Sequence, residues 1–261
     1  MAMFQKKTPL EKEWQLLNKR EEKYLEKRAQ KKDSKLNALL AEKVPAKMQS
    51  TLDAAFEKAF SAIFEKGTGI IEKTYQKEKR EKKYIVNNFA DEVEQSRRSL
   101  RKFSKEAQSA GNQNLLISGV SGIGMGIIGV GLPDIPLFTG MIFRSIYEIA
   151  LSYGYRYDTE EEQYFILKII EGAVSYGETA KRINAEIDYF AADPYLPAGY
   201  DRKVQSKKAA GALSKELLYM KFLQGIPIVG AVGGAYDVIY MKHISEYAQL
   251  KYRKRFLLER R

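Results

Sequence analysis

Four charged side chains border the two glycine-rich stretches of this sequence, where they could form a polar site. Asp134 lies in a Leu-Pro-Asp-Ile-Pro segment, with Arg144 and Glu148 shortly after it. Asp237 closes the second stretch. Such groups could bind a ligand or relay a proton.

Structural roles are also open. Asp134 could cap the helix expected from residue 135, and Arg144 and Glu148, four residues apart, could form a buried ion pair. Asp237 could lie across the core, paired with Arg144 or Lys242.

The sequence offers little for nucleophilic or metal chemistry. It has one histidine, His243, and no cysteine, so it cannot build the usual His/Cys zinc site. No G-x-S-x-G elbow occurs, and a Ser-His-Asp triad would have to use His243, for which we expect a structural role. The G-x-G-x-x-G match at 124–129 lies inside a longer uncharged glycine repeat, which is not typical of a dinucleotide site. We expect no catalytic residue, metal or cofactor.

Two glycine-rich runs, 115–133 and 225–236, are the most distinctive segments of the chain. The first has six glycines and no charge in 19 residues. Each glycine inside a helix costs roughly 1 kcal/mol relative to alanine, so a compensating reason is needed, and close helix packing supplies one. The glycines expected at such contacts are Gly122, Gly126, Gly131, Gly230, Gly233 and Gly234. Three interpretations stay open: a buried hairpin, a hairpin dipping into a membrane, and a membrane-spanning pair, which the charges of Arg144 and Glu148 disfavour.

The remaining patterns predict helices. Thr8-Pro9-Leu10-Glu11 forms a capping box for a long charged helix over 8–42. Apolar residues at helical spacing predict further helices over 45–66, 84–110, 137–153, 159–174, 178–191, 200–223 and 247–261. No segment alternates with period two. We therefore expect an all-α fold, a multi-helix bundle over 44–261 preceded by a basic N-terminal helical extension over 1–43.

The charge is uneven along the chain. Of a net +11, most falls in residues 1–110, which hold 26 of the 44 Lys and Arg but 17 of the 33 Asp and Glu. Because both signs mix there, we do not expect nucleic-acid binding. The C-terminal helix is basic and aromatic, which suits an anionic membrane surface. The residues expected to contact it are Lys251, Tyr252, Arg253, Lys254, Arg255 and Phe256.

Several motifs resemble the EcsC family. They are GLPDIPLFTG (131–140), RSIYEIA (144–150), YGY (153–155), IPIVGAVGGA (226–235) and YRKRFL (252–257). The resemblance covers roughly residues 40–258, with the helix at 8–42 outside it. It implies a helical accessory protein from an operon shared with an ABC-type transporter in some Gram-positive bacteria, and it supplies no catalytic residues.

These observations lead to a functional expectation. The N-terminus lacks the apolar run of a signal peptide, and Ala2 excludes myristoylation. We expect a cytoplasmic, non-enzymatic accessory protein at the inner membrane face, with an anionic membrane surface and an ABC transporter as partners. The alternatives are a soluble enzyme or ligand carrier using a pocket around Asp134, Arg144 and Glu148, and a scaffold whose N-terminal helix recruits a partner.

Overall fold

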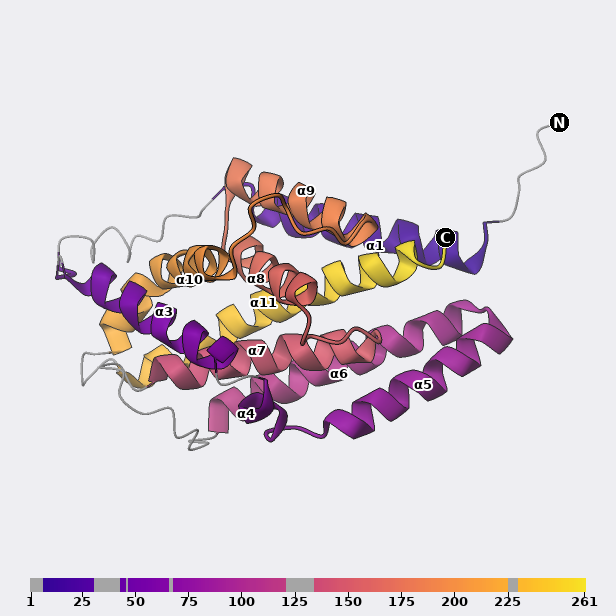
Figure 1. Cartoon of the computed structure of the whole chain (residues 1–261), viewed down its shortest axis with the longest axis horizontal. Coiled ribbons are helices and arrows are strands. Elements are labelled where there is room, and N and C mark those ends of the chain that lie inside the picture. Colours follow the sequence, from indigo (N-terminus) through magenta and orange to yellow (C-terminus); the bar gives the residue numbers. More distant parts are fainter. Residues whose placement is uncertain (1–6, 31–42, 46, 66–67, 121–133, 225–229) are drawn as a thin grey trace.

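The computed structural model describes residues 7–30, 43–45, 47–65, 68–120, 134–224 and 230–261. Within these ranges the chain forms ten helices and no strand, which confirms the predicted all-α bundle (Figure 1). The helices are α1 (Pro9–Lys27), α3 (Met48–Glu65), α4 (Gly69–Glu72), α5 (Lys77–Glu94), α6 (Arg97–Val120), α7 (Asp134–Ser152), α8 (Glu160–Ala173), α9 (Gly177–Ala192), α10 (Arg202–Gln224) and α11 (Gly230–Leu258).

The hydrophobic core is centred on α7, which packs against α3, α5, α6 and α11. Its apolar residues face neighbours on nearly every side, and Ile142, Phe143 and Ile146 are fully buried. Phe143 meets Phe60 and Phe64 of α3 edge to face, with ring centroids 5.1 and 5.5 Å apart. A helix buried all round lies in the middle of a bundle, so the remaining helices are arranged about α7.

Local capping signals place two helix starts where the sequence predicted them. The Thr8 hydroxyl accepts from the Glu11 amide while the Glu11 carboxylate accepts from the Thr8 amide, which completes the capping box of α1. The Thr159 hydroxyl accepts from the Glu162 amide at the start of α8. Three acidic residues in the first turn of α8 add favourable interactions with the helix dipole.

The helix predicted over 84–110 is wrong, because α5 and α6 are separate helices. The chain turns at Gln95, which adopts the left-handed conformation (φ 44°). Ser96 and Ser99 then cap each other's amides through their hydroxyls. These short polar side chains stabilise a helix start at a place where no glycine or proline marks a break.

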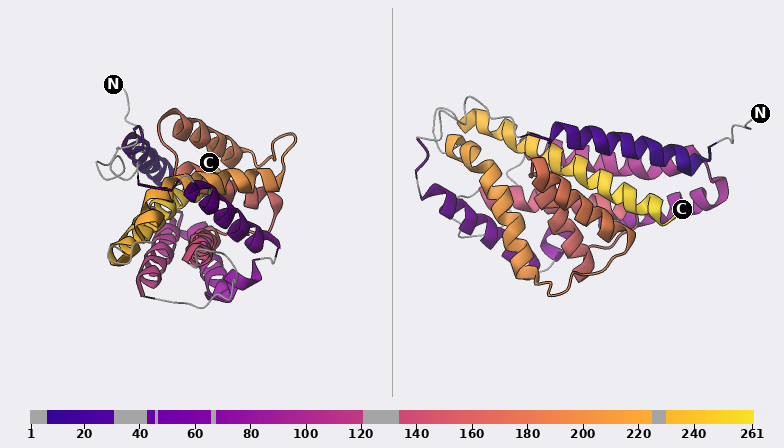
Figure 2. Two further views of the ribbon diagram at one scale, coloured as in Figure 1. Left: turned by 90° about the vertical axis from the view of Figure 1, so that its left-hand side faces the viewer. Right: turned by 90° about the horizontal axis from the view of Figure 1, so that it is seen from above.

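Two other predicted boundaries change. The first helix ends at Lys27 instead of residue 42, and residues 31–42 lie outside the described part of the chain. At the other end, α11 runs without interruption from Gly230 to Leu258, so part of the second glycine-rich run and the basic C-terminal segment belong to one helix. In Figure 1 and in the right view of Figure 2, α1 lies beside α11 with the opposite direction.

The structure describes only part of the two glycine-rich runs. Residues 115–120 end α6, whereas Gly122, Gly126 and Gly131 lie outside the described residues. Gly230, Gly233 and Gly234 lie in the first turns of α11, so the second run is helical from residue 230 onward. Among the described helices, none joins sufficient length with the apolar character needed to cross a bilayer.

Candidate functional site

The predicted pair of Arg144 and Glu148 is present on α7. The Arg144 Nε lies 3.3 Å from the Glu148 carboxylate, which is almost completely buried. Arg80 of α5 donates to the same carboxylate at 2.7 Å, and Asn114 of α6 donates at 3.1 Å. Two cations and an amide satisfy this buried carboxylate, so the cluster joins three helices.

The two other residues of the predicted polar cluster have only their backbone described. Asp134 is the first residue of α7, and Asp237 lies in the first third of α11. Their side chains lie outside the described residues. The capping role of Asp134 therefore stays a prediction, as does the pairing of Asp237 with Arg144 or Lys242.

The basic C-terminal segment does not form a surface, contrary to the expectation of membrane contact. Four of its six side chains are buried and the other two are half-buried, at Lys254 and Arg255. The physical reason is that acidic side chains from other helices neutralise its charges inside the bundle. The six residues are Lys251, Tyr252, Arg253, Lys254, Arg255 and Phe256.

Lys251 and Lys254 share two carboxylates. Both contact Glu21 of α1 and Asp188 of α9, and the Lys254 Nζ lies 2.7 Å from Glu21 and 2.6 Å from Asp188. Burial alone would raise the pKa of Glu21, but the two ammonium groups hold it below its usual range. The four groups thus link α1, α9 and α11.

Two more buried carboxylates anchor α11. Glu13 of α1, fully buried, accepts from Arg97 and Arg101 of α6 at 2.7 and 2.9 Å and from Arg253 of α11. Burial favours a raised pKa for Glu13, yet the three arginines outweigh it and lower the pKa. On the other side of α11, Glu162 accepts from the Tyr252 hydroxyl and from Arg255, both at 2.6 Å, but burial still raises its pKa.

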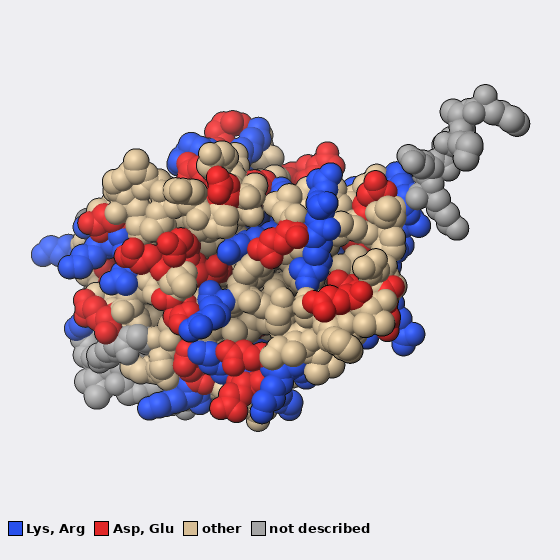
Figure 3. All heavy atoms as spheres, turned by 45° about the vertical axis from the view of Figure 1, so that its right-hand side comes forward, with Lys and Arg blue, Asp and Glu red and all other residues tan. Residues whose placement is uncertain are grey.

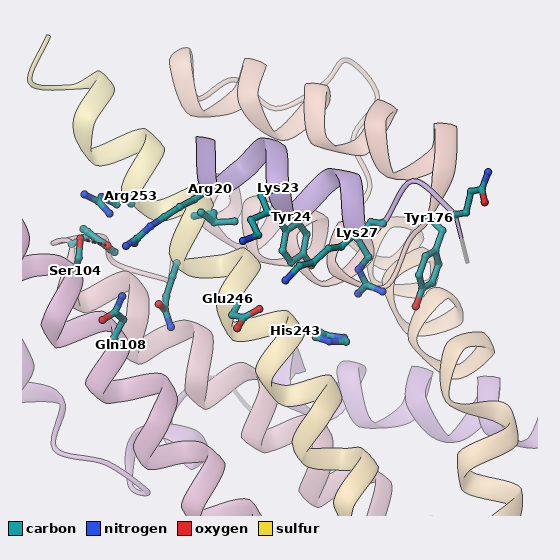
Figure 4. A pocket seen from close by; sticks show the side chains of 15 residues that line it. Arg20, Lys23, Tyr24, Lys27, Ser104, Gln108, Tyr176, His243, Glu246 and Arg253 are labelled. Carbon is teal, nitrogen blue, oxygen red and sulfur yellow. Dashed lines mark hydrogen bonds between the residues drawn. The ribbon is translucent and has the colours of Figure 1, made fainter. Parts of the chain in front are cut away.

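A cavity of about 480 Å³ lies between α1, α6 and α11, next to these anchors. Its lining is strongly basic. The cations are Arg20, Lys23, Lys27, Arg28 and Arg253, whereas Glu246 is the one carboxylate that lines it among the described residues. Figure 4 shows the α1 side chains directed toward α11, which carries His243 and Glu246, with Ser104 and Gln108 contributed by α6. The cavity therefore extends along the groove between the first and last helices.

Aromatic rings and a buried guanidinium form one end of this cavity. Arg28 directly follows α1, is 6% exposed, and lies over the Tyr176 ring with 4.5 Å between the guanidinium carbon and the centroid. It also donates to the Ala173 carbonyl, and its own carbonyl accepts from the Gly177 amide at 2.9 Å. These contacts fix Arg28 against the loop between α8 and α9. At the far end, Arg253 is likewise 6% exposed.

Several polar groups of the cavity have unused hydrogen-bonding or charge capacity. Within the described residues, His243 Nδ1 is buried without a hydrogen-bond partner, whereas the Tyr24 hydroxyl interacts with the Arg28 guanidinium. No described carboxylate is within ion-pair distance of Lys23 or Lys27. A buried polar group is normally paired, so a ligand could supply the partner that His243 lacks, and the charge of the ligand could face the exposed Lys23 and Lys27.

The surroundings of His243 disfavour the protonated form of its imidazole. Burial lowers its pKa, and the positive charges of Arg28 and Lys242 lower it further, against an opposing effect of Glu216. An anion placed in the cavity would oppose these effects and favour the protonated imidazole. His243, expected from the sequence to be structural, thus faces the space where an anion would lie.

This arrangement suits binding better than catalysis. Guanidinium and ammonium groups recognise phosphate and carboxylate oxygens, and tyrosine rings offer apolar contact area with a polar edge. Over the residues that the structure describes, no three His, Asp or Glu side chains are placed to hold a metal ion. On the face drawn in Figure 3, positive and negative side chains are intermingled, so the cavity differs from that surface in its excess of cations.

Sequence reasoning missed these residues, although a signal was present. Arg20, Lys23 and Lys27 recur at spacings of three and four, with Tyr24 and Arg28 each one position on. Such spacing places them along one face of a helix. The face of α11 that opposes them could not be identified without the packing.

Comparison with known proteins gives a family. The model of the EcsC protein family matches residues 11–257. The match begins before residue 40, where the resemblance was expected to start, and includes α1, which packs on α6 and α11. No curated protein matches the chain, and no solved structure matches it. Since the family model spans nearly the whole chain, from the buried Glu13 to the buried Leu257, the protein belongs to the EcsC family.

Proposed function

We propose that the protein binds an organic anion, held through a phosphate or carboxylate group in the cavity between α1 and α11. The observation that carries the proposal is the lining of five cations and one carboxylate around a space of about 480 Å³. Small-molecule sites commonly have this size and place a few polar groups among apolar ones. Arg28, 6% exposed, supplies a fixed guanidinium group. Arg253, equally buried, adds a second one whose charge is shared with Glu13.

The lining also indicates what else the ligand carries. Tyr24, Tyr153 and Tyr176 contribute rings, and Leu250 adds an aliphatic wall. An acidic group attached to an apolar or aromatic body fits this mixture better than an inorganic ion alone. The exposed cations Arg20, Lys23 and Lys27 lie toward solvent and would attract the anion into the cavity.

Accessory action at the cytoplasmic membrane face, with an ABC transporter as partner, is part of this proposal. The shared chemistry is an anionic group, which either a soluble metabolite or a lipid headgroup can supply. The C-terminal segment first expected to contact lipid is buried, so contact with a headgroup would have to use the solvent-facing cations of α1 instead. The two sources are distinguished by experiment.

Titration calorimetry with inorganic pyrophosphate, and flotation with vesicles of phosphatidylglycerol and phosphatidylcholine, test the proposal. The variant Lys23→Glu/Lys27→Glu reverses two cavity charges, and Lys19→Glu reverses an exposed charge on the same helix outside the cavity. We expect the double variant to bind at least about tenfold more weakly, a change of roughly 1.4 kcal/mol, while Lys19→Glu binds as the parent does.

The pattern of binding identifies the source of the anion. Binding of pyrophosphate to the free protein favours a soluble ligand. Binding to the anionic vesicles alone, lost in the double variant, favours a headgroup. If neither probe binds, or if Lys19→Glu weakens binding as much as the double variant, the proposed function is wrong.

A further inference from the structure

Helix α5 presents a stripe of large apolar side chains to solvent. Ile85, Val86, Phe89 and Val93 are 63%, 66%, 68% and 70% exposed. They make up half of the exposed large hydrophobic residues in the described part of the chain, and the others lie on α9, α10, α11 and the loop after α9. A single exposed apolar residue is ordinary, but a cluster on one helix needs an explanation.

The spacing places the four side chains on one face. Ile85, Phe89 and Val93 are separated by four residues each, and Val86 precedes Phe89 by three, so they align along two turns. Together they present on the order of 400 Å² of apolar surface, a size at which a patch on a monomer is commonly functional. The opposite side of α5 packs on α6 and α7. The stripe is thus an unpartnered face of a helix that is otherwise part of the bundle.

The charges beside the stripe change sign along the helix. Three exposed lysines, Lys79, Lys82 and Lys83, outnumber the exposed Glu78 before it. Lys82, 79% exposed, lies 4.0 Å from Glu78, and Lys83 pairs with Glu106 of α6 at 2.8 Å. Glu92 and Glu94 are exposed at its far end. If two copies of this helix packed in parallel, charges of the same sign would lie opposite each other. An antiparallel neighbour would set the lysines of each helix against the glutamates of the other.

We propose that α5 docks on α5 of a second copy of this chain, antiparallel, about a two-fold axis near residues 87–88. In this arrangement Phe89 of one copy packs on Val86 of the other, and Lys82 lies near Glu92 of the other copy, each contact occurring twice. Glu92 and Glu94 disfavour an anionic bilayer as the occupant, because they would lie at its surface. The inference is independent of the cavity.

The area predicts a reversible association. The stripe supplies about half of the roughly 800 Å² per partner that stable interfaces bury. Its charged margins supply part of the rest, so we expect a dimer with a Kd on the order of micromolar. Sedimentation of the full chain over a range of concentrations measures it.

Charge reversal tests the pairing. Phe89→Asp should weaken dimerisation at least about tenfold, as should Lys82→Glu and Glu92→Lys singly, whereas Lys82→Glu/Glu92→Lys should restore the parent value, since opposite charges again face each other. Tyr189→Asp, which changes an exposed aromatic residue on α9, should leave dimerisation unchanged. Every substituted side chain is exposed, so each variant should keep the parent circular dichroism.

Cysteine crosslinking tests the direction, because the chain contains no cysteine. Across the proposed axis Val86 lies opposite Phe89, so the two copies of position 86 approach each other. Val93 lies opposite residue 82, and its two copies are about 16 Å apart along the helices. We expect Val86→Cys to form a disulfide-linked dimer under mild oxidation, and Val93→Cys and Tyr189→Cys to remain monomeric on a denaturing gel.

Three results would overturn the proposal. A chain that stays monomeric at 100 µM or above excludes a second copy as the occupant. Efficient crosslinking through Val93→Cys indicates parallel packing. Flotation with anionic vesicles that Phe89→Asp abolishes, in a chain that does not dimerise, assigns the stripe to a membrane instead.

Discussion

The carboxylate of Glu13, near the start of α1, accepts a hydrogen bond from the guanidinium of Arg253, 240 residues later in α11. Glu13 is fully buried and Arg253 nearly so. Together with the arginines of α6, this contact makes the first helix part of the bundle. It also places α1 where it can form one wall of the basic cavity.

Removing the charge of Glu13 should destabilise the fold strongly. In Glu13→Gln, Arg253 stays buried without its carboxylate, a change that typically costs about 3–5 kcal/mol. Urea unfolding followed by circular dichroism measures the loss. Glu22→Gln, an exposed change on the same helix, should alter the free energy of unfolding by less than about 0.5 kcal/mol. Equal stability of the two variants would show that the buried cluster contributes little.

Deletion of residues 1–43 should prevent the remainder from folding stably. The truncation removes Glu13 and Glu21, which leaves Lys251 and Arg253 of α11 with part of their charge uncompensated and exposes core around Leu17. Thermal melts of the truncated chain, with a deletion of residues 1–6 as control, measure this. A truncated chain that melts at the parent temperature would mean that the first helix is an appendage, as the sequence alone suggested.

Features set by neighbouring residues could be predicted from the sequence. The caps at Thr8 and Thr159 and the pair of Arg144 and Glu148 depend on residues within four positions. The break at Gln95 could not, because a left-handed glutamine has no sequence signature. The helical class followed from apolar periodicity alone.

The environment of the basic C-terminal helix was beyond prediction for a different reason. A run such as Lys251–Arg255 is compatible with a lipid surface or with buried carboxylates. The choice depends on Glu13, Glu21 and Glu162, which lie 93 to 240 residues away along the chain. The cavity depends on the same packing, since only the pairing of α1 with α11 brings its cations together.

Two glycines should respond in opposite directions to alanine. A Cβ at Gly172 would lie 2.9 Å from the ring of Tyr247 and 3.1 Å from Ile183, so Gly172→Ala should destabilise by about 1–3 kcal/mol. Gly211, inside α10, has open space around its Cβ position, so Gly211→Ala should stabilise by about 0.5–1 kcal/mol. The urea concentration at the midpoint of unfolding shows whether each substitution stabilises or destabilises the protein. Stabilisation by Gly172→Ala would contradict the close contact of α8 with α11.

Anion affinity should rise as the pH falls. In the free protein the pKa of His243 is lowered from its usual value of 6.5, and a bound anion would raise it. At a pH between the free-state pKa and the bound-state pKa, binding of the anion therefore takes up a proton. Pyrophosphate affinity should therefore increase by up to about tenfold per pH unit as the pH falls from the pKa of His243 in the complex to its lower pKa in the free protein. Part of this pH dependence is caused by the titration of pyrophosphate itself. His243→Gln should flatten the remaining part. An identical pH profile in the variant would place the anion away from His243.

The most direct test of the cavity as an anion site is an NMR titration that observes the histidine ring. His243 is the only histidine in the chain, so selective ¹³C labelling gives a single imidazole signal from within the cavity. We predict that pyrophosphate shifts this signal saturably at pH 7 and raises the apparent pKa of the ring, and that the Lys23→Glu/Lys27→Glu variant shows neither effect. A signal and a pKa that do not change at millimolar pyrophosphate would contradict the account.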